Sequence, residues 1–224
     1  MPQRPSVVVF DVNETLSDLS PLADRFADLG LPGSMATQWF AALLRDGFAL
    51  TAAGASERFS VVGESVLRTL LAPERLDRDL DEAVQHVMNG FTALPVHPDV
   101  PDGVRALREL GLRLITLTNG STAVGDQLLT RAGLRDAFET LLSVEDAGAW
   151  KPDPASYAYA ARICRVEAAE MLLVAVHPWD IDGASRAGLS TAWVSRSGTD
   201  FPAHFRHPTH TVRALPELAA LLSA

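Results

Sequence analysis

Short apolar segments alternate with amphipathic helical patterns along most of this 224-residue chain. The apolar segments consist almost entirely of Val, Leu, Ile and similar residues, which is typical of parallel strands covered by helices on both faces. They are Val7–Phe10, Leu112–Thr118, Thr140–Val144, Met171–Val176 and Thr191–Val194. Because strands and helices that alternate in this way form βα units, we expect an α/β fold with a Rossmann-like parallel sheet core and helices on both faces.

Three of the connecting helices have recognisable ends. Asp102 is a candidate N-cap for a helix over Gly103–Leu110, because a short polar side chain satisfies free backbone N–H groups at a helix start. A second helix is predicted over Thr122–Ala132, and a third over Pro154–Cys164, where proline occupies a favoured first helical position. The polar segment Ser197–His210 is predicted to be a loop.

Residues 16–95 break the alternation, because they contain no convincing strand. Their apolar residues recur at helical spacing instead; examples are Leu22, Phe26, Leu29, Leu76, Leu80, Val84 and Val87. We interpret this interval as an inserted helical cap domain, with residues 1–15 and 96–224 forming the α/β core. Since open α/β sheets bind ligands beyond the carboxyl ends of their strands, an insertion after the first strand would cover the binding crevice.

The composition narrows the class of protein. Hydrophobic residues make up 47% and charged residues 21%, as in folded globular domains. The net charge of −9 argues against nucleic acid as a partner, because binding phosphates requires a basic surface. The first apolar run has only four residues, too few for a signal segment or a membrane span. With Cys164 as the single cysteine, a cytoplasmic protein without membrane association is expected.

Polar residues follow four of the predicted strands. These groups are Asp11-Val12-Asn13-Glu14-Thr15, Thr118-Asn119-Gly120-Ser121, Trp150-Lys151-Pro152-Asp153 and His177-Pro178-Trp179-Asp180. Taken alone, an aspartate directly after a strand is also compatible with a turn or a helix cap. The carboxyl ends of parallel strands meet at one edge of a sheet, however, and all four groups are therefore expected near one crevice.

In this order and spacing, the four groups resemble the four motifs of the haloacid dehalogenase superfamily, and in particular its type II, L-2-haloacid dehalogenase-like branch. The resemblance covers nearly the whole chain, including the position of the cap. It implies hydrolysis of the carbon–halide bond of short 2-haloalkanoic acids. Asp11 would be the nucleophile, an aspartyl ester the intermediate, and no metal or other cofactor would take part.

Two departures separate the chain from the Mg²⁺-dependent phosphatases of that superfamily. The phosphatases have a second aspartate as general acid where this chain has Asn13, and an amide has no titratable proton near neutral pH. They also have an acidic pair at the fourth motif, where this chain has Ala175 and Val176. Magnesium prefers oxygen ligands, and a valine side chain supplies none.

The resemblance also implies roles for single residues. Lys151 would hold the Asp11 carboxylate charged, Asp180 would keep Lys151 in place and help to organise the water, and Thr15 would hydrogen-bond near the nucleophile. Arg45 in the cap would receive the leaving halide. The implied substrate-binding residues are Thr118, Asn119, Arg45, Asn13, Tyr157 and His177.

The role of His177 stays open at this point, since it stands where the branch has asparagine. It is either a hydrogen-bond donor or a base for the hydrolytic water. Two alternatives to the dehalogenase also stay open: a Mg²⁺-dependent phosphatase of small metabolites, and a non-catalytic relative. The predicted partner is a small haloacid, and the resemblance further suggests a homodimer formed through apolar surface of the cap.

Overall fold

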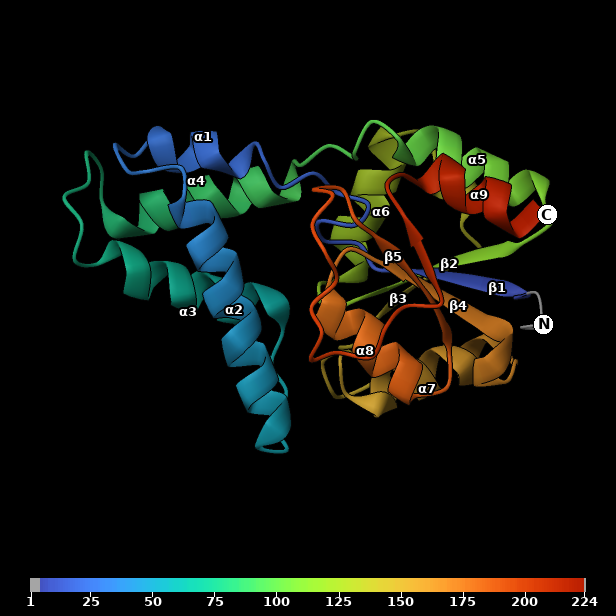
Figure 1. The fold of residues 1–224 in the computed structure, drawn as a ribbon. Coiled ribbons are helices and arrows are strands. Elements are labelled where there is room, and N and C mark those ends of the chain that lie inside the picture. The colour runs from blue at the N-terminus through green and yellow to red at the C-terminus, as the bar shows by residue number, and fades with distance from the viewer. Residues whose placement is uncertain (1–4, 224) are drawn as a thin grey trace.

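The computed structural model describes residues 5–223 and has a parallel six-stranded sheet at its centre (Figure 1). The strand order is β3-β2-β1-β4-β5-β6, and every neighbouring pair is parallel. The strands are β1 (Val7–Phe10), β2 (Arg113–Thr118), β3 (Thr140–Ser143), β4 (Met171–Ala175), β5 (Ser190–Val194) and β6 (His210–Val212). This confirms the predicted α/β class. It also confirms five of these strands, and each end lies within one residue of its predicted position.

Helices cover both faces of the sheet because successive side chains of a strand point to opposite sides. In β1, Val8 and Phe10 pack into one apolar cluster, and Val7 and Val9 into another. The first cluster includes residues of α5 (Val100–Glu109), α6 (Thr122–Arg131) and α9 (Leu215–Ser223), the helices drawn above the sheet in Figure 1. The lower helices are α7 (Pro154–Cys164) and α8 (Pro178–Arg186). The strands β1, β2, β4 and β5 are therefore buried on both sides along almost their whole length.

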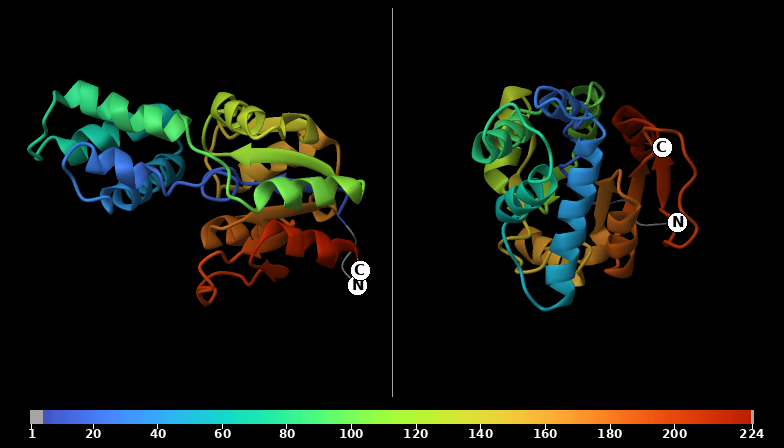
Figure 2. Two further views of the ribbon diagram at one scale, coloured as in Figure 1. Left: turned by 90° about the horizontal axis from the view of Figure 1, so that it is seen from above. Right: turned by 90° about the vertical axis from the view of Figure 1, so that its left-hand side faces the viewer.

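A separate group of helices lies beyond one end of the sheet (Figure 2). It consists of α1 (Leu22–Ala27), α2 (Met35–Ala52), α3 (Phe59–Leu71) and α4 (Leu80–Thr92). Two adjacent segments connect it to the core, because His97 N donates to Leu16 O over 2.9 Å and Asp18 N donates to Pro95 O over 2.8 Å. We call α1–α4 the cap and propose its boundaries at residues 16 and 95.

Two local predictions need correction. Helix α5 begins at Val100 with Asp99 at the N-cap position, so Asp102 lies in the first turn and does not cap the helix. Pro101 explains the earlier start, since proline is favoured at the first helical positions. The predicted loop 197–210 ends one residue early, because His210 begins strand β6. With three residues and only one buried, β6 carries too short an apolar pattern to be recognised.

Replacing two helical glycines by alanine should change the free energy of unfolding in opposite directions. A Cβ on Gly103 would come within 2.9 Å of the Leu215 backbone carbonyl carbon, at the contact between α5 and α9, whereas nothing lies within 4 Å of a Cβ on Gly125. We expect Gly103→Ala to lower the free energy of unfolding by about 1–3 kcal/mol through overpacking. Gly125→Ala should raise it by about 0.5–1 kcal/mol. Urea unfolding of both variants measures the difference, and an equal response would contradict the packing described here.

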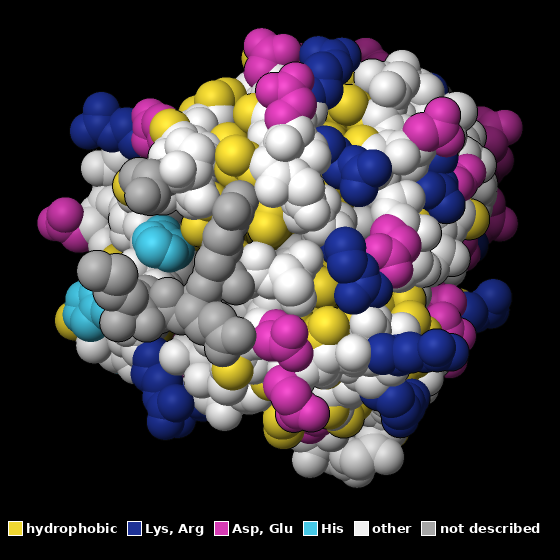
Figure 3. All heavy atoms as spheres, turned by 90° about the vertical axis from the view of Figure 1, so that its right-hand side faces the viewer, with side chains coloured by type: hydrophobic (Ala, Val, Ile, Leu, Met, Phe, Trp, Pro, Cys, Tyr) yellow, Lys and Arg dark blue, Asp and Glu magenta, His cyan; other side chains and the backbone are white. Residues whose placement is uncertain are grey.

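The face of the core opposite the cap carries acidic and basic side chains interspersed with apolar ones (Figure 3). The basic side chains described on that face are separated by acidic and apolar ones, so they form no continuous basic surface. The net charge of −9 likewise argues against binding to nucleic acid. Among the helices within residues 5–223, none combines the length and the apolar character that crossing a bilayer requires.

Candidate active site

The candidate site lies where the strand order reverses. Strand β1 is in the middle of the sheet, between β2 and β4, and ligands of open α/β sheets bind beyond the carboxyl ends at such a position. Asp11 directly follows β1, Thr118 ends β2, Lys151 follows β3, and Asp180 lies in the first turn of α8 after β4. The topology thus brings together groups that are far apart in the sequence.

A lysine between two aspartates forms the centre of the site. The Lys151 Nζ is 2.9 Å from Asp11 Oδ1 and 2.5 Å from Asp180 Oδ2. The side chains of Lys151 and Asp180 are fully buried, and that of Asp11 is 4% exposed. Charges this deep in a protein are stable only when paired and hydrogen-bonded. Two carboxylates and one ammonium leave a formal charge of −1, which concentrates negative charge at Asp11.

Two hydroxyl groups complete this network. Thr15 Oγ1 donates to Asp11 Oδ2 over 2.7 Å and accepts from Val176 N over 3.1 Å, so it fixes the nucleophile candidate against the loop after β4. Tyr157, fully buried on α7, donates its hydroxyl to Asp180 Oδ1 over 2.7 Å. Tyr157 therefore contacts Asp180, and its expected role in binding substrate stays a prediction.

The two residues after β2 have different partners. Both polar atoms of the Asn119 side chain bind the backbone of Lys151: Nδ2 donates to Lys151 O over 3.2 Å, and Oδ1 accepts from Lys151 N over 2.9 Å. The Thr118 hydroxyl accepts from Gly120 N over 2.9 Å, which leaves its own hydrogen for a ligand. Asn119 thus positions Lys151, and Thr118 lies at the wall of a small cavity.

The electrostatics keep Lys151 and Tyr157 protonated. Burial alone would lower the pKa of Lys151, but the Asp11 and Asp180 carboxylates raise it above its ordinary value. Burial raises the pKa of Tyr157 well above its ordinary value, and the Asp180 charge adds to this shift. Lys151 therefore remains an ammonium, and Tyr157 a hydroxyl donor, throughout the neutral range.

His177 lies on the other side of Asp11, stacked at 4.9 Å against Trp179 and at 6.1 Å against Phe40 of the cap. Its Nε2 faces three oxygens: Asn13 O at 3.1 Å, Glu14 Oε2 at 3.6 Å and Asp11 Oδ2 at 3.7 Å. Because all three are acceptors, this nitrogen carries a hydrogen in the resting site.

Glu14 was not singled out from the sequence, although it lies within the first motif. Its φ of 63° is a left-handed conformation that non-glycine residues seldom adopt and that is frequent at functional sites. Burial raises the pKa of Glu14; His177 opposes this shift, and Asp11 adds to it. Only its contact with His177, 163 positions along the chain, shows that it belongs to the site.

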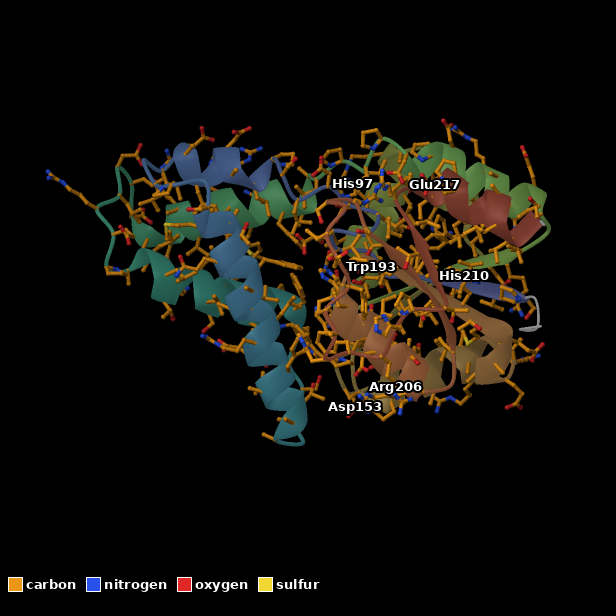
Figure 4. The ribbon with its side chains drawn as sticks, in the orientation of Figure 1. His97, Asp153, Trp193, Arg206, His210 and Glu217 are labelled. Carbon is orange, nitrogen blue, oxygen red and sulfur yellow. The ribbon has the colours of Figure 1, made fainter. Side chains whose placement is uncertain are left out.

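Two cavities are lined by residues that follow Asp11 in the chain, although Asp11 itself lines neither. The smaller, of about 50 Å³, is lined only by uncharged side chains, among them Asn13, Phe59, Phe91 and Thr118. The larger is a cleft of about 750 Å³ between the cap and the core, with Glu14 and His177 in its wall. His97 and Trp193, labelled in Figure 4, stand on the core side of this cleft.

Arg45 does not belong to this group. Its side chain is 72% exposed and pairs with Asp46, and it lines a shallow surface pocket on the cap. The buried residues of α2 include Trp39, Leu43 and Gly47, spaced by four, and Arg45 falls on the opposite side of the helix. Arg45 therefore lies on the outer side of the cap and not at the candidate site, where the expected role of receiving a leaving halide would place it.

Comparisons with known proteins agree with this architecture. The chain is 29% identical to the (S)-2-haloacid dehalogenase of Pseudomonas sp. strain YL over 96% of this chain and 93% of that protein. It is 27% identical to haloacetate dehalogenase H-2 of Moraxella sp. strain B, over 96% and 97% of the two chains. The structure of L-2-haloacid dehalogenase from Xanthobacter autotrophicus with chloropropionic acid covalently bound superposes with a TM-score of 0.87 at 26% identity. That superposition covers 98% of this chain and 99% of the other.

The chain also matches the profile of a protein family. A profile of the haloacid dehalogenase-like hydrolases matches residues 5–188, which include all four motifs and the cap. This match confirms the superfamily that the motifs predicted, and the chain belongs to the haloacid dehalogenase-like hydrolase family.

Proposed function

We propose that this protein hydrolyses the carbon–halogen bond of short 2-haloalkanoic acids and releases halide and a 2-hydroxy acid. The observation that carries the proposal is the Asp11 carboxylate at the end of β1, held by the Lys151 ammonium at 2.9 Å. The dehalogenase names of the relatives, and the relative with chloropropionic acid covalently bound, support the same reaction.

In the first step, one Asp11 oxygen attacks C2 of the substrate. A carbon–oxygen bond forms, the carbon–halogen bond breaks, and the halide leaves with its electron pair. The Lys151 ammonium holds one oxygen of the attacking carboxylate at 2.9 Å, and the Thr15 hydroxyl orients the other. Thr118 has a hydroxyl hydrogen available for the substrate carboxylate, and the Asn13 amide offers a donor to the halide.

The size of the small cavity favours short acids. A cavity needs about 10–15 Å³ for each water molecule that it holds. A cavity of about 50 Å³ therefore has room for about four water-sized groups. Chloroacetate and 2-chloropropionate fit this space, whereas a long alkyl chain on C2 would contact Phe59 and Phe91 in the cavity wall.

In the second step, water attacks the carbonyl carbon of the Asp11 ester. Asp180 is too buried to meet this water, because its side chain is fully enclosed and both of its oxygens are bonded to Lys151 and Tyr157. Glu14 lines the large cleft, from which water arrives, and its raised pKa suits a general base.

We assign the water-activating role to Glu14 and a donor role to His177. Glu14 takes a proton from the water and returns it to the departing 2-hydroxy acid as the acyl carbon–oxygen bond breaks. The second proton of the water remains on the Asp11 carboxyl group and passes to solvent, which regenerates the carboxylate. Because Nε2 of His177 faces Asp11 Oδ2 at 3.7 Å, it stabilises the negative charge that develops on an ester oxygen during the attack.

The variant Glu14→Gln tests this assignment. We expect alkylation of Asp11 to continue and ester hydrolysis to slow by about 10²–10⁴, as for loss of a general base. Mass spectrometry after mixing with chloroacetate should then show enzyme that carries a carboxymethyl group. In the wild type, hydrolysis should slow as the pH falls through the pKa of Glu14, which burial raises above the ordinary 4.5, and this acid limb should disappear in the variant. The matched control is Asp200→Asn, an acid in the wall of the same cleft. Unchanged turnover in Glu14→Gln would contradict the assignment.

The function itself is tested by halide release from chloroacetate, both enantiomers of 2-chloropropionate and 2-chlorohexanoate, each with and without EDTA. We expect release from the short acids, little from 2-chlorohexanoate, and no effect of EDTA. Complete inhibition by EDTA would overturn the metal-independent mechanism. Release of phosphate from an aryl phosphate with Mg²⁺, in the absence of halide release, would identify the phosphatase alternative.

The residues present do not fit the phosphatase alternative. Magnesium in that branch is held by carboxylates, but Asp11 and Asp180 both bond to Lys151, and Val176 has no oxygen to offer. Inactivity towards both haloacids and phosphates would instead favour a non-catalytic relative. We further propose that the protein is cytoplasmic and forms a homodimer. Sedimentation of the purified chain tests whether it is a dimer.

A further inference from the structure

Trp150 belongs to the core loop between β3 and α7, but its polar contacts reach the cap. Its backbone N–H donates to Thr51 Oγ1 at the end of α2 over 3.1 Å. Its indole Nε1 donates to Glu57 O, in the segment between α2 and α3, over 2.9 Å. The residue is fully buried. A side chain of the core is thus held on two sides by the cap.

Both faces of the indole are also occupied by the cap. Phe59, the first residue of α3, stacks on it with ring centroids 5.8 Å apart and planes at 14°. Helix α2 approaches the ring at Gly47, where a Cβ would lie only 2.8 Å from Trp150 Cδ2. This contact requires glycine, because any side chain at position 47 would overlap the ring.

The residue that follows is Lys151. Its backbone is held from the core side by Asn119 through two hydrogen bonds, and Trp150, its neighbour in the chain, links it to the cap. Phe59, on the far face of the indole, also lines the small cavity. The same tryptophan therefore contacts the cap, the wall of the substrate cavity and the backbone of the residue that holds Asp11.

We propose that Trp150 is a positioning residue that couples the seating of the cap to the placement of Lys151 against Asp11. With the cap seated, Thr51, Glu57 and Phe59 fix the indole, and the Lys151 ammonium lies within hydrogen-bond distance of Asp11. With the cap displaced, the Trp150 N–H and the ring lose their partners, and the loop that carries Lys151 is released. This inference rests on the proposed function for its effect on turnover, but the coupling is a physical property that can be measured without substrate.

The test removes one hydroxyl. Thr51→Val keeps the shape of the side chain and removes the acceptor of the Trp150 N–H, whereas Thr51→Ser keeps the acceptor. The matched control is Thr69→Val, since the Thr69 hydroxyl bonds only to Ser65 O within α3. Amide hydrogen exchange of Trp150 and turnover of chloroacetate are measured in all three variants and in the wild type.

We expect Thr51→Val to speed exchange of the Trp150 amide by about tenfold or more, the effect of one lost hydrogen bond. We further expect kcat to fall by about tenfold while KM stays within about twofold, because an interaction of the reacting carboxylate is weakened and substrate contacts are kept. Thr51→Ser should restore both quantities, and Thr69→Val should change neither.

Three outcomes would overturn the coupling: unchanged exchange in Thr51→Val, a fall in kcat that serine does not restore, or an equal fall in Thr69→Val. If the wild type releases no halide, the proposed function has failed and the exchange measurement alone decides the coupling. A second variant tests the coupling through the other contact: Trp150→Phe keeps an aromatic ring, loses the bond to Glu57 O, and should also lower kcat without a matching change in KM.

Discussion

Asp11→Asn is expected to reduce halide release to the level of the uncatalysed reaction. An amide of the same shape keeps the contacts of the carboxylate but is not a nucleophile. Loss of the attacking group in a site whose members act as a unit costs on the order of 10⁶ in kcat. Halide release from chloroacetate measures the effect, and Asp11→Ala excludes activity regained through deamidation.

The fold of Asp11→Asn should survive intact. The change removes one of two carboxylates that share a single ammonium, so Lys151 and Asp180 remain as a balanced pair. We therefore expect the melting temperature to equal or exceed that of the wild type, as is common when a functional charge is removed. The matched control is Asp153→Asn at the N-cap of α7, where asparagine caps about as well as aspartate. Halide release within tenfold of the wild type would rule out Asp11 as the nucleophile.

Lys151→Met should produce the largest loss of stability. Methionine retains the length of the side chain but leaves Asp11 and Asp180 buried without a cation. Breaking a buried ion pair on one side costs about 3–5 kcal/mol. For a chain of this length, that lowers the melting temperature by roughly 10 °C. We expect halide release to be lost as well, because Asp11 then loses the ammonium that holds it in place.

The pH dependence identifies the cause. Burial and the Asp11 charge raise the pKa of Asp180, and the Lys151 charge opposes them; without the ammonium, the pKa of Asp180 in the folded state rises further. A carboxyl group whose folded pKa is raised destabilises the fold at high pH, and this cost disappears as the pH falls through that pKa. The stability of Lys151→Met should therefore approach that of the wild type as the pH is lowered from about 8 to about 5. Addition of Asp180→Asn should restore part of the loss at pH 8. A deficit that does not depend on pH would show that only packing was lost.

Much of the core was predictable because its signals are local. Strand β1 is a run of four apolar residues followed directly by the Asp11 carboxylate. Helix α7 begins with Pro154 and ends at Cys164, as predicted. Lys151, Asp180 and Thr15 were assigned through the motifs, and the structure brings all three to Asp11. That they act in catalysis stays a prediction.

The residues that were missed depend on long-range packing. The sequence predicts helices in the cap but not how α2 turns towards the core, and Arg45 was therefore assigned to the site although it lies on the outer side of the helix. The spacing of Trp39, Leu43 and Gly47 was the available signal. The contact between Thr51 and Trp150 joins positions 99 apart, and no local pattern predicts it.

The 140 positions between Asp11 and Lys151 have a consequence for the synthesis of this protein. A growing chain that has left the ribosome only as far as β3 already carries the attacking carboxylate, yet it lacks the ammonium, Asp180 and Tyr157. The network around Asp11 is complete only after α8 has been synthesised, so an intact site requires nearly the whole polypeptide.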